Sequence, residues 1–514
     1  MPKKILIVDF GSQTCHLIGR RLKDMGVEVE IIDPENALSQ IKKIKPAGLI
    51  FSGGPASVYA KAAPTIDKKV FNLGIPILGI CYGWQLTAQL LSGKVVSGHK
   101  EYGPATLKLK VNLSGDGPKS KILANVPRSS KVWVSHGDTV SKLPGGFEII
   151  GSTASVKAAF ITCQDRKIYG VQFHPEVEHT VAGKTILANF AKGICQLKIG
   201  KRVININKII DKIKTEVGQA KVVGAVSGGT ESTIASIFCI RAIGKNYIPV
   251  YVHSNLMRAG TKEFVKKIFT KYGVKPRIID ASQEFLKRLK GVVDPEKKRL
   301  VIGNLYYELI KNEIKKIKGV EYYLQGTVYS DVIESKGTKK ADKIKSHHNV
   351  GGLPAEMGLK LLEPLREYYT DEVRKIGHLL KLPEEIIYMQ PFPGPGHAIR
   401  IVGEVTPQRL AKQQKSDQIV LEELKKAGIF AEIFQSFSVM TGAQSAAVKG
   451  DGRAWCEVVA VRIVTTQDRM TADWARLPAD LLQRISSRIV SEVPDISRVV
   501  YDITTKPPAT MEWE

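Results

Sequence analysis

The sequence predicts an α/β fold class: two parallel-sheet α/β domains followed by a smaller α+β domain. A chain of 514 residues is too long for one hydrophobic core, which indicates several domains. Short apolar runs alternate with helix-period stretches over most of the chain, as in parallel sheets covered by helices. Near residue 389 this pattern changes, because QPFPGPGHAIRI is too rich in proline and glycine for a helix. The predicted domains are 1–196, 203–388 and 389–514.

The strands of each predicted domain are its apolar runs in chain order. In the first domain they are KILIVDF, VEVEIID, AGLIFSG and PILGIC. The lysine-rich segment near 197–210, QLKIGKRVININKI, has no strong period and is predicted to be a linker. The second domain continues with KVVGAV, IPVYVHS, PRIIDAS and EYYLQGT. The third contains EVVAVRIV and RVVYDIT among helices.

The net charge of +26, from 76 basic and 50 acidic residues, has two interpretations. Such an excess is typical of nucleic-acid-binding proteins. The lysines are spread along the chain without interleaved aromatic residues, however, which favours solvated helix faces and pockets for anionic substrates. Small-molecule substrates are therefore the expected partners, and a nucleic-acid-binding role is the less favoured alternative.

Several features of the sequence bear on its compartment. No apolar run approaches the roughly 20 residues that span a bilayer. The segment MPKKILIVDFGSQ enters a strand without a signal-peptide pattern. The six cysteines contain no C-x-x-C pair, which speaks against a disulfide framework and a cysteine zinc site. A cytoplasmic protein with no membrane segment is expected.

A cysteine stands where an apolar strand passes into a helix, in IPILGICYGWQLTAQLL. A nucleophile at such a turn is held clear of the sheet, and the first amides of the helix favour its thiolate and can stabilise an oxyanion. Alone, Cys81 would more often be a buried apolar residue. In GVQFHPEVEHT, however, His174 and Glu176 share a face of an extended segment, so the carboxylate can orient an imidazole that serves the thiol.

These two motifs resemble those of the class I glutamine amidotransferases, C-x-G-x-Q at residues 81–85 and H-P-E at 174–176. The resemblance implies a glutaminase in which Cys81 attacks the side-chain amide, His174 shuttles the proton and Glu176 orients His174. Trp84 stands where Met or Leu is commoner and is expected to narrow the glutamine pocket. The implied oxyanion and glutamine-binding residues are Gly54, Tyr82, Gln85, Ser135, His136 and Asp138.

A second motif, GAVSGGTEST at 224–233, is predicted to bind phosphate. A glycine-rich turn after a strand and before a helix offers successive backbone amides to an anion. The loop lacks the lysine of the G-x-x-x-x-G-K-[ST] pattern and resembles instead the pyrophosphatase loop of ATP-adenylating enzymes. That resemblance implies ATP as substrate and Mg²⁺ as cofactor, with Glu231 as a metal ligand. The implied ATP-binding residues are Ser227, Gly228, Gly229, Thr230, Glu231, Ser232 and Thr233.

Further stretches along the chain resemble the GMP synthases. They are GTVYSDVIES (326–335), KIKSHHNVGGLP (343–354), LEPLREYYTDEVRKIG (362–377), PFPGPG (391–396), MTADWARLP (470–478) and TKPPATMEWE (505–514). The resemblance implies amination of XMP to GMP through an adenylated nucleotide, with release of AMP and pyrophosphate. It also implies a homodimer formed by the third domain, whose C-terminal tail reaches the XMP site. The implied contacts are Lys345 to ATP, and Arg258, Gln435, Lys506 and Glu512 to the nucleotide.

Several residues of the second half depart from the GMP synthase pattern. They are Glu231 for Asp, His253, Ser254 and Asn255 in VYVHSNLMR, Ser330 for Pro, Met389 for Arg, His397 for Leu and Gln444 for Arg. The extra methylene of Glu231 moves its carboxylate by roughly 1.5 Å, and the lost arginines remove two fixed donors for anions. Two alternatives stay open: a paralogue with the same chemistry on a different purine-like nucleotide, and a glutaminase with a degenerate synthetase half.

Overall fold

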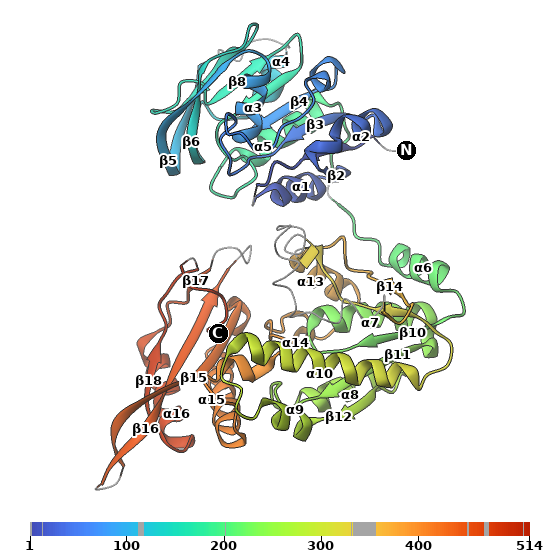
Figure 1. The fold of residues 1–514 in the computed structure, drawn as a ribbon, viewed down its shortest axis with the longest axis vertical. Helices are drawn as coiled ribbons and strands as arrows, with labels where there is room; N and C mark the ends of the chain where they lie inside the picture. Colours follow the sequence, from blue (N-terminus) through green and yellow to red (C-terminus); the bar gives the residue numbers. More distant parts are fainter. Residues whose placement is uncertain are drawn as a thin grey trace. The chain divides into compact units, whose positions relative to one another are not determined.

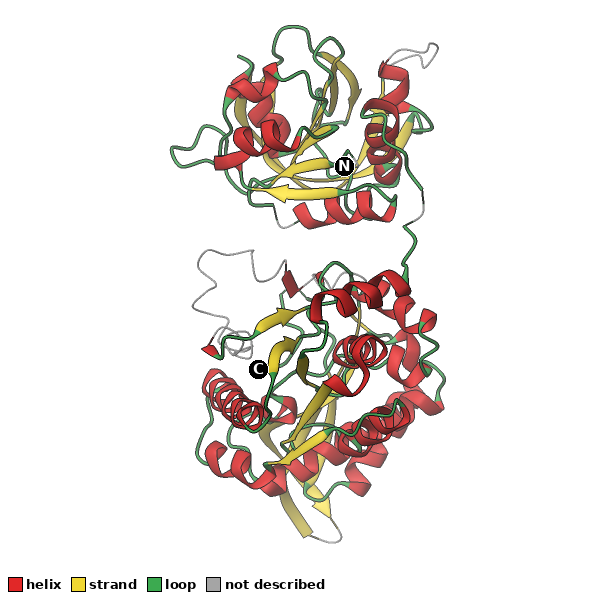
Figure 2. Cartoon of the chain, turned by 90° about the vertical axis from the view of Figure 1, so that its right-hand side faces the viewer, coloured by secondary structure: helices red, strands yellow, loops and turns green. Residues whose placement is uncertain are grey.

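The computed structural model describes residues 3–12, 14–110, 118–200, 202–329, 331–332, 356–449, 452–466, 472–506 and 508–514. They form two compact units, Met1–Ile204 and Asn205–Glu514 (Figure 1, Figure 2). Both units contain parallel strands covered by helices, and the second also carries an antiparallel sheet, so the predicted α/β fold class is confirmed. No helix in the described ranges is long and apolar enough to cross a membrane.

The first unit is built on a nine-stranded sheet in the order β2-β1-β3-β4-β9-β8-β7-β5-β6. Five strands are parallel: β2 (Val29–Ile32), β1 (Ile5–Val8), β3 (Gly48–Phe51), β4 (Ile77–Ile80) and β9 (Ile168–Val171). The other four continue it antiparallel: β8 (Phe160–Cys163), β7 (Glu148–Ser152), β5 (Lys94–Leu109) and β6 (Ser129–Lys142). The four apolar runs predicted as strands are β1 to β4.

Both faces of the parallel half are covered. Ile5 and Ile7 of β1 belong to one hydrophobic cluster and Leu6 and Val8 to another, so successive side chains enter cores on opposite faces of the sheet. The helices of this unit are α1 (Cys15–Asp24), η1 (Pro34–Asn36), α2 (Ala37–Ile44), η2 (Lys68–Asn72), α3 (Tyr82–Leu90), α4 (Pro118–Leu123), α5 (Gly183–Ala188) and η3 (Asn189–Ile194).

The second unit begins with a five-stranded parallel sheet in the order β12-β11-β10-β13-β14. Its strands are β10 (Lys221–Ala225), β11 (Tyr247–His253), β12 (Arg277–Asp280), β13 (Val320–Leu324) and β14 (Lys360–Leu362), and the first four are the predicted runs. Its helices are α6 (Ile206–Val217), α7 (Thr230–Ile243), η4 (Gly244–Asn246), α8 (Thr261–Lys271), α9 (Ser282–Leu289), α10 (Pro295–Lys315), α13 (Thr370–Leu379) and α14 (Glu384–Ile387).

The prediction of a linker over 197–210 is wrong at its C-terminal end. Helix α6 begins at Ile206, and the Asn205 side chain caps it by accepting a hydrogen bond from the Lys208 amide at 3.0 Å. The lysines of α6 lie on the exposed face of an amphipathic helix whose Ile213 and Val217 are buried. The many lysines on the exposed face make the apolar period of α6 difficult to recognise in the sequence.

The chain after residue 389 is α+β, as predicted. β15 (Gln435–Lys449) pairs antiparallel with β16 (Gly452–Thr465), which also pairs with β17 (Asp473–Trp474) and, in parallel, with β18 (Ile496–Tyr501). The helices are η7 (Gly396–Arg400), α15 (Pro407–Lys426), η8 (Phe430–Glu432) and α16 (Ala479–Glu492). The proline-rich stretch therefore leads only into the short 3-10 turn η7.

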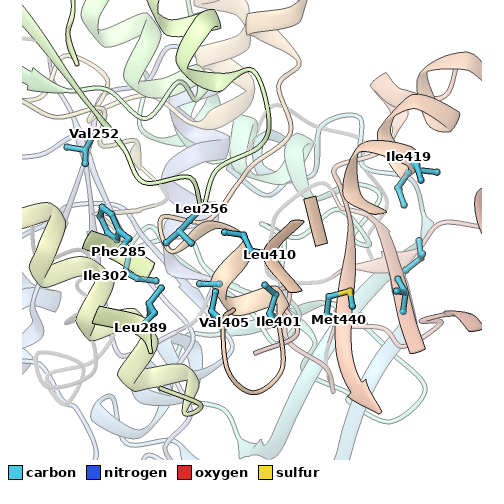
Figure 3. Packing of buried hydrophobic residues seen from close by; sticks show 14 of the residues in the cluster. Val252, Leu256, Phe285, Leu289, Ile302, Ile401, Val405, Leu410, Ile419 and Met440 are labelled. Atoms are coloured by element: carbon cyan, nitrogen blue, oxygen red, sulfur yellow. The ribbon is translucent and has the colours of Figure 1, made fainter. Parts of the chain in front are cut away.

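One hydrophobic core runs through the second unit. Val252 and Phe285 of the α/β part lie in the same cluster as Ile401 and Met440 (Figure 3). Residues 205–388 and 389–514 consequently share one compact unit. The domain boundary expected at 389 stays a prediction.

Candidate active site

Cys81 occupies a strained turn between β4 and α3. Its φ of 49° and ψ of −106° are rarely adopted by non-glycine residues and cost on the order of 1–3 kcal/mol. The Cys81 amide donates to the Val171 carbonyl at 2.7 Å, which fixes the turn to β9. Gly83 permits the close approach of α3 to β3, because a Cβ there would lie 2.4 Å from the Phe51 carbonyl oxygen. The surrounding structure thus holds the thiol where strand and helix meet.

His174 and Glu176 lie just after β9, the strand that pairs with β4. Nδ1 of His174 lies 2.8 Å from Oε1 of Glu176, whose side chain is fully buried. The Thr14 hydroxyl donates to the same oxygen at 2.6 Å, and the Thr180 hydroxyl donates to the His174 carbonyl at 2.6 Å. Both ring and carboxylate are therefore fixed in orientation.

The electrostatics of this pair favour a charged imidazole. Burial opposes protonation of His174, but the Glu176 carboxylate and the adjacent Cys81 thiol raise the pKa of His174 well above its ordinary value. The thiol itself donates to the Ser135 carbonyl and accepts from Nε2 of Gln172, each at 3.6 Å. The structure therefore brings the three predicted residues of the triad together.

Two predicted oxyanion residues lie side by side. A Cβ on Gly54 would approach the Tyr82 ring to 3.2 Å and the Phe10 carbonyl oxygen to 2.7 Å, so this position has no room for a side chain. Tyr82 is the first residue of α3, where backbone amides have no acceptor within the helix. A side chain at residue 53 would likewise crowd the imidazole, because a Cβ on Gly53 would lie 3.2 Å from Cε1 of His174.

The predicted glutamine-binding residues line up along β6 and α3. Gln85 donates to the Asp138 carbonyl at 2.8 Å, and Tyr59 donates to the Asp138 carboxylate at 2.9 Å. Burial lowers the pKa of His136, although Glu101 lies 3.5 Å from its Nε2. Gln85 therefore holds β6 next to the nucleophile, while Ser135 contacts the thiol directly.

The expectation that Trp84 narrows the glutamine pocket is wrong. Trp84 is fully buried and packs against Phe147 with ring centroids 5.6 Å apart. Gly170 makes room for it, because a Cβ there would lie 2.7 Å from the indole. The indole belongs to the hydrophobic core between α3 and the sheet.

The second predicted site, at 227–233, comprises the turn after β10 and the first residues of α7. Gly228 has a φ of +83°, and a Cβ there would lie 2.9 Å from Cγ2 of Thr261. The Ser227 hydroxyl accepts from the Gly229 amide at 3.2 Å and lies 3.1 Å from the Ser232 hydroxyl. This compact turn at the N-terminus of a 14-residue helix has the geometry of an anion-binding site.

The two threonines of the loop have structural contacts. The Thr230 hydroxyl donates to the Ile386 carbonyl at 2.7 Å, and both Thr230 and Thr233 are buried. The Thr233 amide donates to the Gly229 carbonyl at 3.1 Å, so its contact with ATP stays a prediction. A contact of Thr230 with ATP would come from its backbone amide at the start of α7. Lys345 and Ser330 lie outside the described residues.

Glu231 is the one carboxylate of the loop, and it is half-buried at the start of α7. No group of three or more potential metal-ligating side chains occurs among the described residues. A single carboxylate nevertheless fits Mg²⁺, which in nucleotide enzymes takes further oxygens from phosphates and water. The Mg²⁺ site stays a prediction.

A cavity of about 130 Å³ opens at the C-terminal end of β11. His253 and Asn255, two of the departures from the family pattern, line it together with Arg258. Nδ1 of His253 is buried and has no hydrogen-bond partner among the residues that the structure describes. Asn255 adopts a φ of +60°, which asparagine tolerates better than most residues.

Arg258 enters a buried charge cluster. It pairs with Asp417 at 2.8 Å and donates to the Ser436 carbonyl at 2.8 Å. Asp417 also lies 3.7 Å from Arg400, whose guanidinium is fully buried between Phe392 and Phe437. Burial opposes ionisation of Asp417, but the Arg258 and Arg400 guanidinium groups hold its pKa below the ordinary value.

Glu512 lies against this cluster together with Gln435. Arg400 donates to both Glu512 carboxylate oxygens at 3.1 Å, and Nε2 of Gln435 donates to Oε1 at 2.6 Å. Lys506 is tied by its main chain to Ala472, with N–O distances of 2.8 and 3.0 Å. Three of the four predicted nucleotide contacts, Arg258, Gln435 and Glu512, therefore meet around Arg400.

The remaining departures lie in different environments. His397 is buried against Phe392, and burial together with Arg400 and Arg258 lowers its pKa to about 3, so it packs as a neutral ring. Met389 is half-buried before the proline-rich stretch, and Gln444 is exposed on β15. Gln444 is thus part of the sheet surface.

Sequence reasoning missed several residues of both sites. Gln172 precedes His174 by two positions on an extended segment, a spacing that could have indicated it. Thr14, Arg400 and Asp417 carried no local signal, because their partners are distant in the chain.

Comparisons with known proteins agree with the two motifs. A family model described as glutamine amidotransferase class-I matches residues 6–194, and one for the GMP synthase C terminal domain matches 422–513. Proteins named GMP synthase [glutamine-hydrolyzing] are 49% identical in Aquifex aeolicus (100% of this chain, 99% of the relative) and 48% identical in Halothermothrix orenii (99% of each). The relative from Bacillus cereus is 45% identical over 99% of each chain. A glutamine amido transferase structure from Methylobacillus flagellatus is 15% identical, covering 40% of this chain and 98% of that one, with a TM-score of 0.30.

Proposed function

The chain belongs to the family of glutamine-hydrolysing GMP synthases, and we propose that it aminates XMP to GMP with ammonia released from glutamine. ATP is the second substrate, and AMP, pyrophosphate and glutamate are the other products. The observation that carries the proposal is the Cys81–His174–Glu176 arrangement in one unit together with the phosphate loop in the other.

Glutamine hydrolysis is proposed to begin at the Cys81 sulfur. The thiolate attacks the side-chain amide carbon, and the backbone amides of Gly54 and Tyr82 stabilise the oxyanion. His174 gives its proton to the departing ammonia, which leaves a thioester. His174 then takes a proton from the water that hydrolyses the thioester to glutamate. Glu176 stabilises the imidazolium at 2.8 Å through these steps.

The 227–233 loop is proposed to hold the pyrophosphate portion of ATP. Support comes from the positive φ of Gly228 and from the amides at the start of α7. Glu231 would hold Mg²⁺, which neutralises phosphate charge when bound. Lys345 is expected to contact ATP phosphates. The carbonyl oxygen of the nucleotide attacks the α-phosphate and pyrophosphate leaves, which gives an adenylated nucleotide. Ammonia then attacks the activated carbon and AMP leaves.

The nucleotide is proposed to bind where Arg258, Gln435 and Glu512 converge, and Lys506 is expected to contact it. Support comes from the hydrogen bond between Gln435 and Glu512 and from the buried Arg400 guanidinium, which pairs with Glu512. His253 and Asn255 line the neighbouring cavity at the end of β11, where the departures could alter nucleotide choice.

A homodimer formed through residues 389–514 is also proposed. Val448 of β15 and Trp455 of β16 are 79% and 73% exposed, which is unusual for large apolar side chains outside an interface. A cytoplasmic location is proposed because all six cysteines are free and buried. Light scattering of the purified chain tests the dimer.

The proposed function is tested by pyrophosphate release from ATP and Mg²⁺ with ammonium as the nitrogen donor. Reactions contain XMP, IMP or no nucleotide. Release that depends on XMP, with GMP as product, is expected. Release that depends on another nucleotide would instead identify a paralogue, and no release beside intact glutamine hydrolysis would identify a degenerate synthetase half.

A further inference from the structure

We propose that Lys298 and Arg299 are positioning residues for the nucleotide site: they hold Glu514 and thereby place Glu512 beside Gln435. Both basic residues lie on α10, far in sequence from the segment that they hold. The inference rests on the proposed function, because Glu512 is there the carboxylate that meets the purine nucleotide.

Lys298 and Arg299 grip Glu514 at two points. Nζ of Lys298 lies 2.8 Å from Oε2 of Glu514 and donates to the Ile401 carbonyl at 2.6 Å. Arg299 donates to the main-chain carbonyl of Glu514. The Lys298 side chain is fully buried and that of Glu514 is 9% exposed. This residue is therefore held through its side chain and its backbone together.

Burial of the Lys298 ammonium group costs free energy, because the charge loses its contact with water. An ammonium group out of water is tolerated only when its donors are satisfied, and an apolar side chain of similar volume is usually as stabilising. Burial disfavours the charged form of Lys298, and Glu514 opposes that effect. We therefore interpret the contact between Lys298 and Glu514 as specific binding of the Glu514 carboxylate.

The clamp restrains the chain on the C-terminal side of Glu512. The Glu512 carbonyl itself accepts from the Thr510 hydroxyl at 2.5 Å. Before Glu512, Arg462 donates to the carbonyls of Thr510 and Met511 at 2.9 and 3.2 Å. After Glu512, Glu514 contacts Lys298 and Arg299. Loss of the clamp would leave the segment held from one end, so Glu512 would sample more positions around Arg400 and Gln435.

Lys298 acts through the backbone of 512–514, since its side chain contacts Ile401 and Glu514. Its loss should therefore weaken nucleotide binding and leave the chemical step at saturation almost unchanged. A residue that only stabilises the fold would instead lower the midpoint of thermal unfolding and leave the KM for XMP unchanged.

The test measures ammonium-dependent pyrophosphate release at varied XMP in the full chain and in three variants. Lys298→Met, Glu514→Gln and the double variant are each expected to raise the KM for XMP at least about tenfold, with kcat within about twofold. The KM for XMP of the double variant should be no higher than that of the more impaired single variant, because both substitutions break the same contact between Lys298 and Glu514. Arg288→Gln is the matched control, since it removes exposed ion pairs to Glu284 and Glu308 beside the same helix.

Each other outcome has a distinct meaning. A wild-type chain without XMP-dependent release overturns the proposed function, whatever the variants do. An active wild type with an unchanged KM in Glu514→Gln overturns the clamp, as does additive behaviour in the double variant. If Lys298→Met fails to fold, Glu514→Gln still decides the matter, because it changes no residue of the hydrophobic core.

Discussion

Glu176 is the residue whose replacement tests the glutaminase geometry most directly. Glu176→Gln keeps the shape of the side chain and removes its charge. The Thr14 hydroxyl, which donates to Oε1 at 2.6 Å, can donate equally to an amide oxygen, so the side chain should keep its position. The substitution therefore isolates the effect of the buried charge on His174.

The expected loss follows from the 2.8 Å contact between His174 and Glu176. A hydrogen bond to a charged group contributes about 1.5–3 kcal/mol, which corresponds to roughly 10- to 150-fold in rate. Burial of both side chains favours the upper half of that range, since solvent does not screen the pair. We expect kcat/KM for glutamine to fall by about 50-fold or more.

The assay follows glutamate formation against glutamine concentration in wild type and variant. Pyrophosphate release with ammonium serves as the internal control and should keep its wild-type rate, because the substitution lies in the other unit. A loss below about threefold would refute the role of the charge in stabilising the imidazolium. An equal loss with ammonium would refute the division of labour between the units.

Three further predictions concern the same two sites. Cys81→Ala should abolish activity with glutamine and spare it with ammonium, which parallel pyrophosphate assays check; loss with both donors contradicts it. Glu231→Asp should keep ATP turnover within about tenfold of wild type, because the ligand type is unchanged; an inactive Asp variant would mean that the loop is built around the longer side chain. Burial opposes protonation of His174, but the Glu176 carboxylate outweighs this effect and raises the pKa of His174. The folded chain therefore binds this proton more tightly than the unfolded chain. The resulting stabilisation is complete below about pH 6.5 and is lost as pH rises through the folded pKa; urea unfolding across pH 6–9 should show this decline, and Glu176→Gln should flatten it.

The sequence predicted those parts of the fold and the sites that depend on local pattern. The parallel strands are short apolar runs, and β1 to β4 and β10 to β13 lie where those runs stand. The turn at Cys81 and the loop at 227–233 each follow a strand and open a helix, so their geometry is set by neighbours in the chain.

Features that depend on distant contacts could not be predicted. The long antiparallel strands β5 and β6 alternate buried and exposed residues, so they lack the continuous apolar run of the parallel strands. Thr14 meets Glu176 across 162 positions, and Lys298 meets Glu514 across 216. The buried position of Trp84 on α3 could not be predicted, because the space for its indole is created by Gly170 on β9.

The separate hydrophobic cores of the two units bear on how the protein tolerates mutation. A cavity opened among the residues packed around Ile50 destabilises 1–204 and leaves the packing of 205–514 intact. Within 205–514 the opposite holds, since Phe285 and Met440 share one core and damage to either spreads across residue 389. Residues 1–204 can therefore accumulate substitutions independently. A loss of stability around the 227–233 loop, in contrast, also destabilises the C-terminal segment at 510–514, and the reverse holds as well.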